Sequence, residues 1–196
     1  MNLILSPHWD DEVLGCASFL NSEATVLYFT QGLLSFPGWR KEMDKVYGDG
    51  GFQRILLDFP IHHLDAIAQA GIITNIEHSI ATYKPETVLI PFSSYNQDHH
   101  AIHDAALTAM RPNDKQHFVK RILVYEEPDV FGTMASFKPN YFRPLDIDRK
   151  VRLCEIYESQ MRGHRSADLL RAIAQIRGMQ AQIPSAEAFE VLRWVE

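Results

Sequence analysis

The chain has 196 residues, of which 46% are hydrophobic and 22% are charged. These values are typical of one ordinary globular domain with a sizeable core. The formal net charge is −6 and there is no dense run of Lys and Arg, which argues against a nucleic-acid partner, because such a partner needs a surface that neutralises phosphates.

Short apolar runs alternate along the chain with stretches of helical periodicity. In chain order we expect a strand at residues 3–5, a helix at 11–20, a strand at 24–29, a helix at 39–47, a strand at 54–59, a helix at 72–83, a strand at 86–91, a helix at 101–110, a strand at 121–125, and helices at 146–161 and 167–182. This alternation predicts a Rossmann-like three-layer α/β domain, with a mainly parallel sheet, helices on both faces and a helical C-terminal part. Such a domain places its functional site beyond the carboxyl ends of the strands.

The cysteines and the apolar pattern bear on location. Cys16 and Cys154 lie far apart and show no metal-ligand spacing, so we expect free thiols rather than a disulfide framework. The first residues lack the features of a signal peptide, and no apolar stretch approaches transmembrane length. These observations predict a cytoplasmic protein.

Residues 7–12, with the sequence PHWDDE, follow the first expected strand and place an imidazole and three consecutive carboxylates at a turn into a helix. Adjacent like charges are unfavourable unless a cation or hydrogen-bond donors offset them. A structural role explains part of the pattern, since Asp11 could cap the helix and Glu12 could complement its dipole. It leaves His8 and Asp10 unexplained, so the stretch favours a metal or catalytic site.

Residues 96–104, with the sequence NQDHHAIHD, follow the fourth expected strand. On a helix His99 and His103 share one face, while His100 points elsewhere. Solvent-facing imidazoles at a polar helix start are the structural alternative. Together the two motifs supply two histidines and a carboxylate with an open coordination position, which is the pattern of a catalytic zinc site. Divalent iron or manganese would also accept such ligands.

Residues 7–12 resemble the HPDDE motif of the LmbE/PIG-L-like N-acetylglucosaminyl deacetylases, with Trp9 in place of proline, and residues 96–99 resemble the second motif of that family, usually HPDH. Further segments resemble family features in the same order: residues 84–88 (KPETV), 138–142 (KPNYF), 157–160 (YESQ), 177–178 (RG) and 186–190 (AEAFE). The resemblance covers nearly the whole chain and implies one deacetylase domain over residues 1–196.

The resemblance implies a zinc-dependent hydrolase that removes an N-acetyl group from a small amino-sugar derivative. His8, Asp11 and His99 would be the metal ligands, with Fe²⁺ or Mn²⁺ as possible replacements for Zn²⁺. Asp10 would be the general base that draws a proton from the attacking water. The partner would be a small N-acetylated sugar or glycoside.

Asn96 departs from the family pattern, because the second motif usually begins with a histidine thought to stabilise the oxyanion. An Asn amide can donate a hydrogen bond but cannot act as an acid. Asp98 then loses its usual partner and could orient another group, such as a ligand histidine, while Glu12 would support its turn. Five other side chains could supply a further donor: Tyr95, His62, His63, His100 and His103.

Arg40 lies where the family often has an arginine that holds substrate hydroxyl or phosphate groups, although position 43 lacks the acid of that pattern. A solvated helix residue is the alternative. Phe36, Pro37 and Trp39 could form an apolar rim for a sugar ring, reshaped by Trp9, or could pack onto the core.

Two other functions remain open at this point. Asp98, His99 and His100 could be the DHH signature of metal-dependent phosphoesterases, which would require further aspartates on neighbouring strand ends. Asn96 leaves open a non-catalytic sugar- or nucleotide-binding module on the same scaffold. The substrate of a deacetylase could be a sugar nucleotide, a glycolipid precursor, a thiol-cofactor precursor or an antibiotic intermediate.

Overall fold

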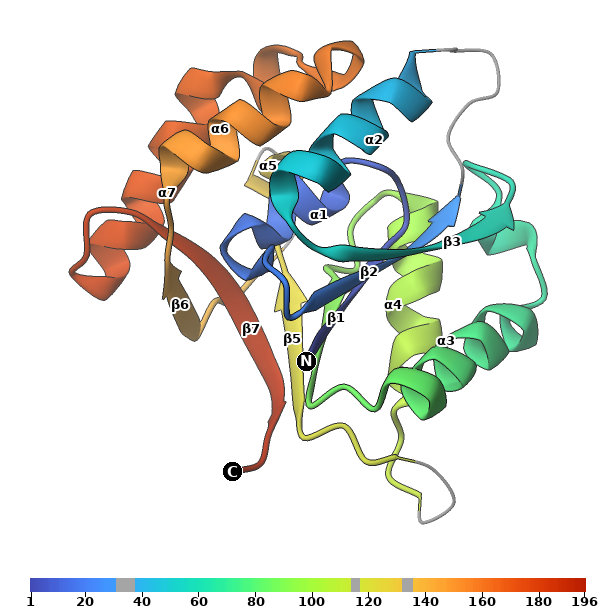
Figure 1. Cartoon of the computed structure of the whole chain (residues 1–196). Coiled ribbons are helices and arrows are strands. Elements are labelled where there is room, and N and C mark those ends of the chain that lie inside the picture. The colour runs from blue at the N-terminus through green and yellow to red at the C-terminus, as the bar shows by residue number, and fades with distance from the viewer. Residues whose placement is uncertain (31–37, 114–116, 132–135) are drawn as a thin grey trace.

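The computed structural model describes residues 1–30, 38–113, 117–131 and 136–196. Within these residues seven strands form one sheet in the order β3-β2-β1-β4-β5-β7-β6 (Figure 1). The strands are β1 (Asn2–Ser6), β2 (Ala24–Thr30), β3 (Gln53–Phe59), β4 (Thr87–Pro91), β5 (Arg121–Tyr125), β6 (Tyr141–Pro144) and β7 (Ala186–Trp194).

The first five strands are parallel to one another, as the alternation of strands and helices predicts. The central strands β1, β2 and β4 are almost continuous apolar runs because helices cover them on both sides. The five parallel strands lie in the order 3-2-1-4-5, which is the order of a doubly wound Rossmann sheet. The predicted three-layer α/β class is confirmed.

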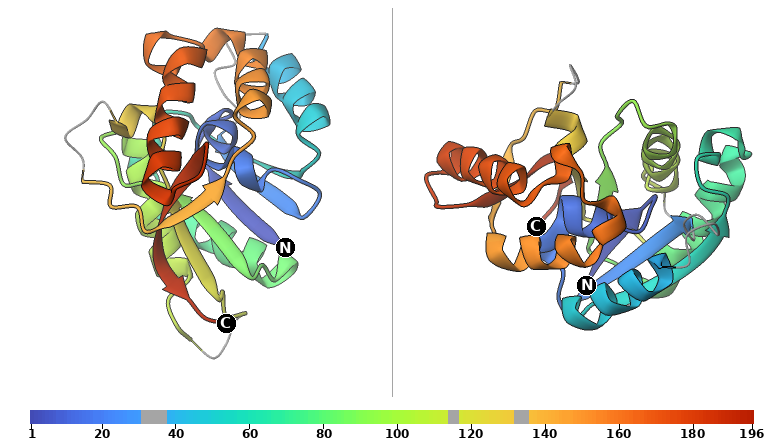
Figure 2. Two further views of the ribbon diagram at one scale, coloured as in Figure 1. Left: turned by 90° about the vertical axis from the view of Figure 1, so that its left-hand side faces the viewer. Right: turned by 90° about the horizontal axis from the view of Figure 1, so that it is seen from above.

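The helices divide between the two faces of the sheet (Figures 1 and 2). Alternate residues of each strand pack into different layers, so that Leu3 and Leu5 contact one apolar cluster and Ile4 contacts the other. The α-helices are α1 (Asp11–Cys16), α2 (Trp39–Gly50), α3 (Gln69–Tyr83), α4 (Gln97–Ala109), α5 (Pro128–Phe131), α6 (Ile147–Ile156) and α7 (Ala167–Ala181). Helices α3 and α4 cover one face, and α1, α2, α6 and α7 cover the other.

Two predicted helices are shorter than expected. The first ends at Cys16 and continues as a 3₁₀ turn, η1 (Ala17–Phe19). The one expected at 146–161 is α6 followed by a separate turn, η3 (Glu158–Gln160), because Tyr157 leaves helical backbone geometry and its side chain is buried. None of the described helices is long and apolar enough to cross a membrane.

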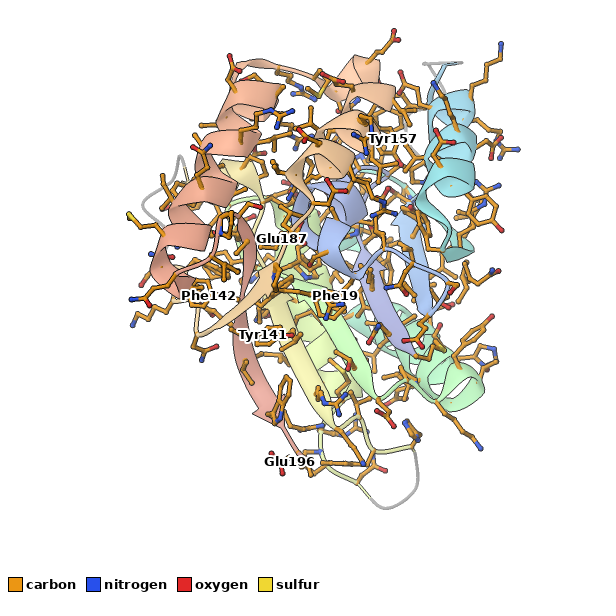
Figure 3. The ribbon with its side chains drawn as sticks, turned by 60° about the vertical axis from the view of Figure 1, so that its left-hand side comes forward. Phe19, Tyr141, Phe142, Tyr157, Glu187 and Glu196 are labelled. Atoms are coloured by element: carbon orange, nitrogen blue, oxygen red, sulfur yellow. The ribbon has the colours of Figure 1, made fainter. Side chains whose placement is uncertain are left out.

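The C-terminal part is not only helical, because β7 pairs antiparallel with β5 and β6 pairs antiparallel with β7. The sequence analysis does not predict these strands, since β6 has four residues and β7 starts with Ala and Glu, which are poor strand formers. Figure 3 shows Glu187, near the start of β7, beside Phe19 of the N-terminal part of the chain. Glu187 accepts hydrogen bonds from the backbone N–H groups of Ala17 (2.9 Å) and Ser18 (2.7 Å).

A buried ion pair completes this contact between the two ends of the chain. The Lys150 Nζ on α6 lies 2.7 Å from Glu187 Oε1 and also donates to the backbone oxygen of Leu14 at 2.6 Å. The C-terminal layer therefore fixes the end of α1, the helix that begins at the first motif.

The topology places both sequence motifs at one edge of the sheet. Strand β1 leads to β2 on one side, and its other neighbour is β4, so the chain changes direction across the sheet between β1 and β4. The crevice at such a switch point is where open α/β sheets bind ligands. Residues 7–12 follow β1, and the second motif begins at Asn96 after the loop that follows β4, so the two motifs meet there.

A substitution at Gly15 tests the packing beneath this crevice. A Cβ atom at Gly15 would overlap the ring of buried Tyr125, whose hydroxyl donates to the backbone oxygen of Leu5 at 2.9 Å. We expect Gly15→Ala to destabilise the protein by about 1–3 kcal/mol in urea unfolding. Gly48→Ala is the control, because no atom lies within 4 Å of its added methyl group. It should be neutral or stabilising by about 0.5–1 kcal/mol, and equal stability of the two variants would contradict the packing described.

Candidate functional site

Three predicted ligand residues converge at the switch point. His8 follows β1, Asp11 is the first residue of α1 and His99 lies in the first turn of α4. The His99 Nε2 atom lies 3.3 Å from His8 Nδ1 and 3.6 Å from Asp11 Oδ1, and His8 Nδ1 lies 3.4 Å from Asp11 Oδ2. All three side chains are buried. Their ligand atoms lie close enough together to share one metal ion.

The donor set of this cluster fits a divalent cation. Asp11 Oδ2 accepts the backbone N–H of His8 at 2.7 Å, but the buried Oδ1 has no hydrogen-bond partner among the described residues. A buried carboxylate oxygen without a partner is unfavourable. Two imidazole nitrogens and one carboxylate also match an open catalytic zinc site.

The pKa shifts within the cluster also favour a bound cation. Burial alone would lower the pKa of His8, but Asp11 and Asp98 outweigh it and raise that pKa to about 10. Burial alone would raise the pKa of Asp11, but His99 and His8 hold it well below its usual range. Without a metal, His8 therefore holds a proton beside the negative charge of Asp11. A bound cation would neutralise the same negative charge.

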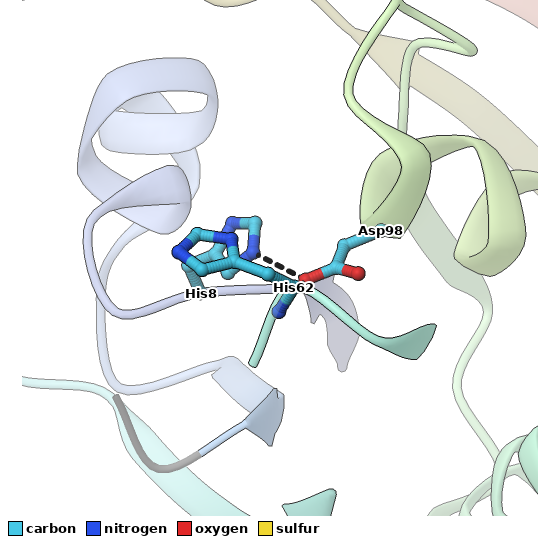
Figure 4. A group of neighbouring side chains, drawn as sticks. All are labelled: His8, His62 and Asp98. Atoms are coloured by element: carbon cyan, nitrogen blue, oxygen red, sulfur yellow. Dashed lines mark hydrogen bonds and ion pairs between the residues drawn. The ribbon is translucent and has the colours of Figure 1, made fainter. Parts of the chain in front are cut away.

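Asp98 fixes the orientation of His8 (Figure 4). His8 Nε2 lies 2.9 Å from Asp98 Oδ2, and the carboxylate also accepts the backbone N–H groups of His62 (2.7 Å) and Leu64 (3.0 Å). These bonds outweigh burial and lower the pKa of Asp98. A carboxylate that accepts the N–H of a ligand histidine turns the opposite ring nitrogen toward the metal. His8, His62 and Asp98 could also group around an ion, but hydrogen bonds already explain the position of Asp98.

Glu127 lies beside the second histidine, although its buried Oε1 has no hydrogen-bond partner among the described residues, and the sequence analysis did not predict this neighbour. It follows β5, and its Oε1 lies 3.6 Å from His99 Nδ1, on the side opposite the cluster. Burial and the charge of Asp11 raise the pKa of Glu127 well above its ordinary value. No motif marks Glu127, because only the neighbouring positions of β4 and β5 in the sheet bring it to His99.

Asp10 forms a buried ion pair with Arg165, also missed from sequence. Arg165 Nη1 donates to Asp10 Oδ2, and Nη2 lies 3.2 Å from Asp129 Oδ2. Burial raises the pKa of Asp10, and the Arg165 guanidinium opposes the shift. Asp10, not Asp11, is the N-cap residue of α1, and its side chain makes no capping bond. Capping of α1 by a side chain therefore explains neither Asp10 nor Asp11.

Glu12 supports the turn between β1 and α1 through a contact with the C-terminal part of the chain. It is fully buried on α1, and its Oε1 accepts a hydrogen bond from the Tyr157 hydroxyl at 2.8 Å. Burial raises the pKa of Glu12 to about 8, while the bond from Tyr157 opposes the shift and Asp10 adds to it. Glu12 lies in the packed layer under α1 and does not contact the histidine cluster.

Asn96 has a structural role beside the cluster. It is the N-cap of α4, and its Oδ1 accepts the backbone N–H of Asp98 at 3.0 Å. Only the amide Nδ2 is therefore left to donate to a ligand. Asn96 and His99 line a cavity of about 290 Å³.

The other histidines suggested as donors lie outside the cluster. His63 is exposed. Exposed His100 bonds to Ser93 Oγ at 2.6 Å, and His103 bonds to the backbone oxygen of Pro91 at 2.8 Å. His62 stands nearest, with its ring centroid 5.9 Å from that of His8.

The structure describes only some of the residues that the sequence analysis suggested as substrate contacts. Arg40 is exposed in the first turn of α2, and Phe36 and Pro37 lie outside the described residues. Trp9, which was expected to reshape the rim, is buried in the core, and its ring centroid lies 6.1 Å from that of partly buried Trp39. A large apolar ring at this position is more stable packed under α2 than exposed to water.

The chain belongs to the PIG-L family, described as GlcNAc-PI de-N-acetylases, whose model matches residues 3–110. The match contains both motifs and all three clustered ligand residues. No curated protein matches the chain in a sequence search.

Solved structures share the fold over the whole chain. The conserved protein TT1542 of Thermus thermophilus is 21% identical with a TM-score of 0.82, over 100% of this chain and 96% of that one. N,N'-diacetylchitobiose deacetylase of Pyrococcus horikoshii is 17% identical with a TM-score of 0.77, over 98% and 83%. GalB, the 4-carboxy-2-hydroxymuconate hydratase of Pseudomonas putida, is 18% identical with a TM-score of 0.77, over 100% and 98%. These likenesses establish the fold, which serves more than one reaction.

The bond between Asp98 and His8 predicts an effect on metal affinity. We expect Asp98→Asn to weaken Zn²⁺ binding by about 10–100-fold, because His8 loses the carboxylate that orients it. Competition with a chromogenic chelator measures the affinity, and circular dichroism checks the fold. His100→Ala is the control, since exposed His100 bonds only to residues outside the cluster. Unchanged affinity in Asp98→Asn, or an equal loss in His100→Ala, would contradict this role.

The raised pKa of Glu12 predicts a pH-dependent stability in the metal-free protein. Folded Glu12 keeps its proton up to about pH 8, whereas in the unfolded chain it loses the proton above its ordinary pKa of 4.5. Unfolding therefore releases a proton between these values, and stability falls as the pH rises, by up to about 1.4 kcal/mol per pH unit. In urea unfolding at a series of pH values, we expect Glu12→Gln to lose only the Glu12 contribution, so that its stability falls less steeply than that of the wild type between about pH 4.5 and 8. Glu23→Gln, at an exposed position, should leave the slope unchanged.

Proposed function

We propose that this protein is a metal-dependent amide hydrolase that removes the N-acetyl group of a small amino-sugar derivative. The observation that carries the proposal is the convergence of His8, His99 and Asp11 on one point, with an unpartnered carboxylate oxygen. Membership of a de-N-acetylase family supports the choice of reaction.

In this proposal His8 Nδ1, His99 Nε2 and Asp11 hold the metal, with Zn²⁺ as the first choice and Fe²⁺ or Mn²⁺ as alternatives. When bound, the cation supplies positive charge that polarises an amide carbonyl and acidifies water. Asp98 keeps the imidazole of His8 turned toward it, and Glu127 lies on the far side of the imidazole of His99.

Asp10 acts as the general base. Arg165 binds its Oδ2, which leaves Oδ1 to take a proton from the attacking water. Burial raises the pKa of Asp10, which makes it a stronger base than an ordinary aspartate. Asp10 then returns the proton to the amine as the carbon–nitrogen bond breaks, so that acetate and a free amino sugar are released.

Asn96 donates from Nδ2 to the carbonyl oxygen as negative charge develops there. Arg40 contacts substrate hydroxyl groups from α2. Glu12 takes no part in proton transfer and supports the turn that holds its two neighbours. We further propose that the protein works in the cytoplasm, where the buried, unpaired Cys16 and Cys154 would stay reduced.

The DHH phosphoesterase alternative is disfavoured. That function needs Asp98, His99 and His100 to act on one site. Asp98 instead binds backbone N–H groups and His8, and His100 is exposed and paired with Asp104.

A second candidate is the addition of water to an activated double bond, as a hydratase performs. It is raised by the hydratase GalB, which shares the fold with a TM-score of 0.77. Acetate release distinguishes the candidates, because hydration adds water without releasing acid. A sugar-binding module would bind in the metal-loaded state and do neither.

The assignment of Asp10 predicts a separation of metal binding from turnover. Asp10→Asn should keep its metal by elemental analysis and lose about 10²–10⁴-fold in acetate release from N-acetyl sugars and glycosides. Asp104→Asn, at a solvent-facing aspartate of α4, is the matched control and should keep full activity. Wild-type rates in Asp10→Asn would show that another group is the base.

A further inference from the structure

His62 holds a backbone conformation that residues with a side chain rarely adopt. Its φ angle is 64°, in the left-handed region that glycine enters without strain. Two other non-glycine residues among those described have a positive φ, Lys84 and Gln182. Each of these two ends a helix, where a left-handed residue is common. His62 ends no helix, because it lies between β3 and the 3₁₀ turn η2 (Leu64–Ala66). Its conformation therefore lacks this ordinary explanation.

The second motif holds His62 in this conformation. The backbone N–H of His62 donates to Asp98 Oδ2 at 2.7 Å, and its backbone oxygen accepts from Gln97 Nε2 at 3.3 Å. The chain beyond His62 is fixed as well, because the N–H of buried Leu64 donates to the other oxygen of Asp98 at 3.0 Å. A strained residue persists only where the surrounding contacts fix it, and such residues cluster at functional sites.

The imidazole of His62 lies beside the proposed metal site. Its ring centroid is 5.9 Å from that of His8, at an interplanar angle of 48° (Figure 4). His62 is exposed, and its ring makes no hydrogen bond or ion pair with the part of the chain that the structure describes. Because His8 is one of the three proposed metal ligands, a substrate held at the metal comes within reach of the His62 ring.

The strained backbone and the uncommitted ring of His62 have a common explanation. Glycine at position 62 would remove the strain, but it would also remove the ring. A neutral imidazole carries one N–H donor and one nitrogen acceptor, and both can pair with a hydroxyl group. A histidine at a position that suits glycine therefore indicates a role for the side chain itself.

We propose that His62 is a substrate-binding residue that hydrogen-bonds a hydroxyl group of the amino sugar beside His8. This inference rests on the proposed function and adds to its site a contact from the loop after β3. Asp98 and Gln97 fix the backbone of that loop before the substrate arrives, so the loop loses little conformational freedom on binding.

Glycine at position 62 separates a binding role from a structural one. We expect His62→Gly to be at least as stable as the wild type in urea unfolding, because glycine adopts a positive φ without strain. The same variant should bind N-acetylglucosamine about three- to tenfold more weakly, which corresponds to the loss of one hydrogen bond. An NMR titration of the zinc-loaded full chain measures the binding, and elemental analysis should give an unchanged zinc content. In acetate release, KM should rise by a similar factor and kcat should change less.

Two further variants control this comparison. Gln182→Gly makes the same backbone change at the end of α7, outside both motifs, so it should also be at least as stable as the wild type and should bind the sugar equally well. His62→Asn keeps a donor and an acceptor and tolerates a positive φ, so it should recover most of the binding that His62→Gly loses.

The outcomes separate this inference from the proposed function. Unchanged sugar binding in His62→Gly, or no binding by the wild type at millimolar concentration, would overturn the inference. A lower stability of His62→Gly would also overturn it by indicating a structural role, and a loss of zinc would do so by indicating that His62 is a metal ligand. An unchanged KM in His62→Gly would overturn it while leaving deacetylation intact. The expected binding results without acetate release from any N-acetyl sugar would leave the inference standing and overturn the proposed reaction.

Discussion

The structure depends on burying three consecutive acidic side chains at the start of α1, of which Glu12 keeps its proton up to about pH 8. Each acid meets a different partner: Arg165 for Asp10, the two imidazoles for Asp11, and the Tyr157 hydroxyl for Glu12. An uncompensated buried charge would cost several kcal/mol, so these contacts are a condition for the turn to exist. Asp11 keeps an unpartnered oxygen that faces the histidines.

This requirement explains the arrangement of the chain around the sheet. The adjacent strands β1, β4 and β5 deliver the first motif, the second motif and Glu127 to the same edge. The C-terminal segments then close over α1 and bring Arg165 and Tyr157 to the acids, while Lys150 and Glu187 fix the end of the helix. A family match that ends at residue 110 contains the three proposed metal ligands but not these supporting side chains.

Charge also determines how the acids of the site are held. Arg165 pairs with both Asp10 and Asp129, so its guanidinium neutralises carboxylates of the chain itself. As the cap of α4, Asn96 offers one neutral donor to the cavity.

The sequence by itself determined the parallel α/β core, because strand and helix periodicities are local, and it placed both motifs after strands. It also singled out His8, Asp10, Asp11 and His99, since consecutive acids beside histidines have no ordinary structural explanation. Contacts between distant parts of the chain were decided by the tertiary structure. Glu127 and Arg165 reach the site, and β7 joins the sheet, only through packing of segments far apart in sequence. The burial of Trp9 was likewise decided by the tertiary structure, because it depends on the packing of Trp9 in the core and not on its neighbours in the chain.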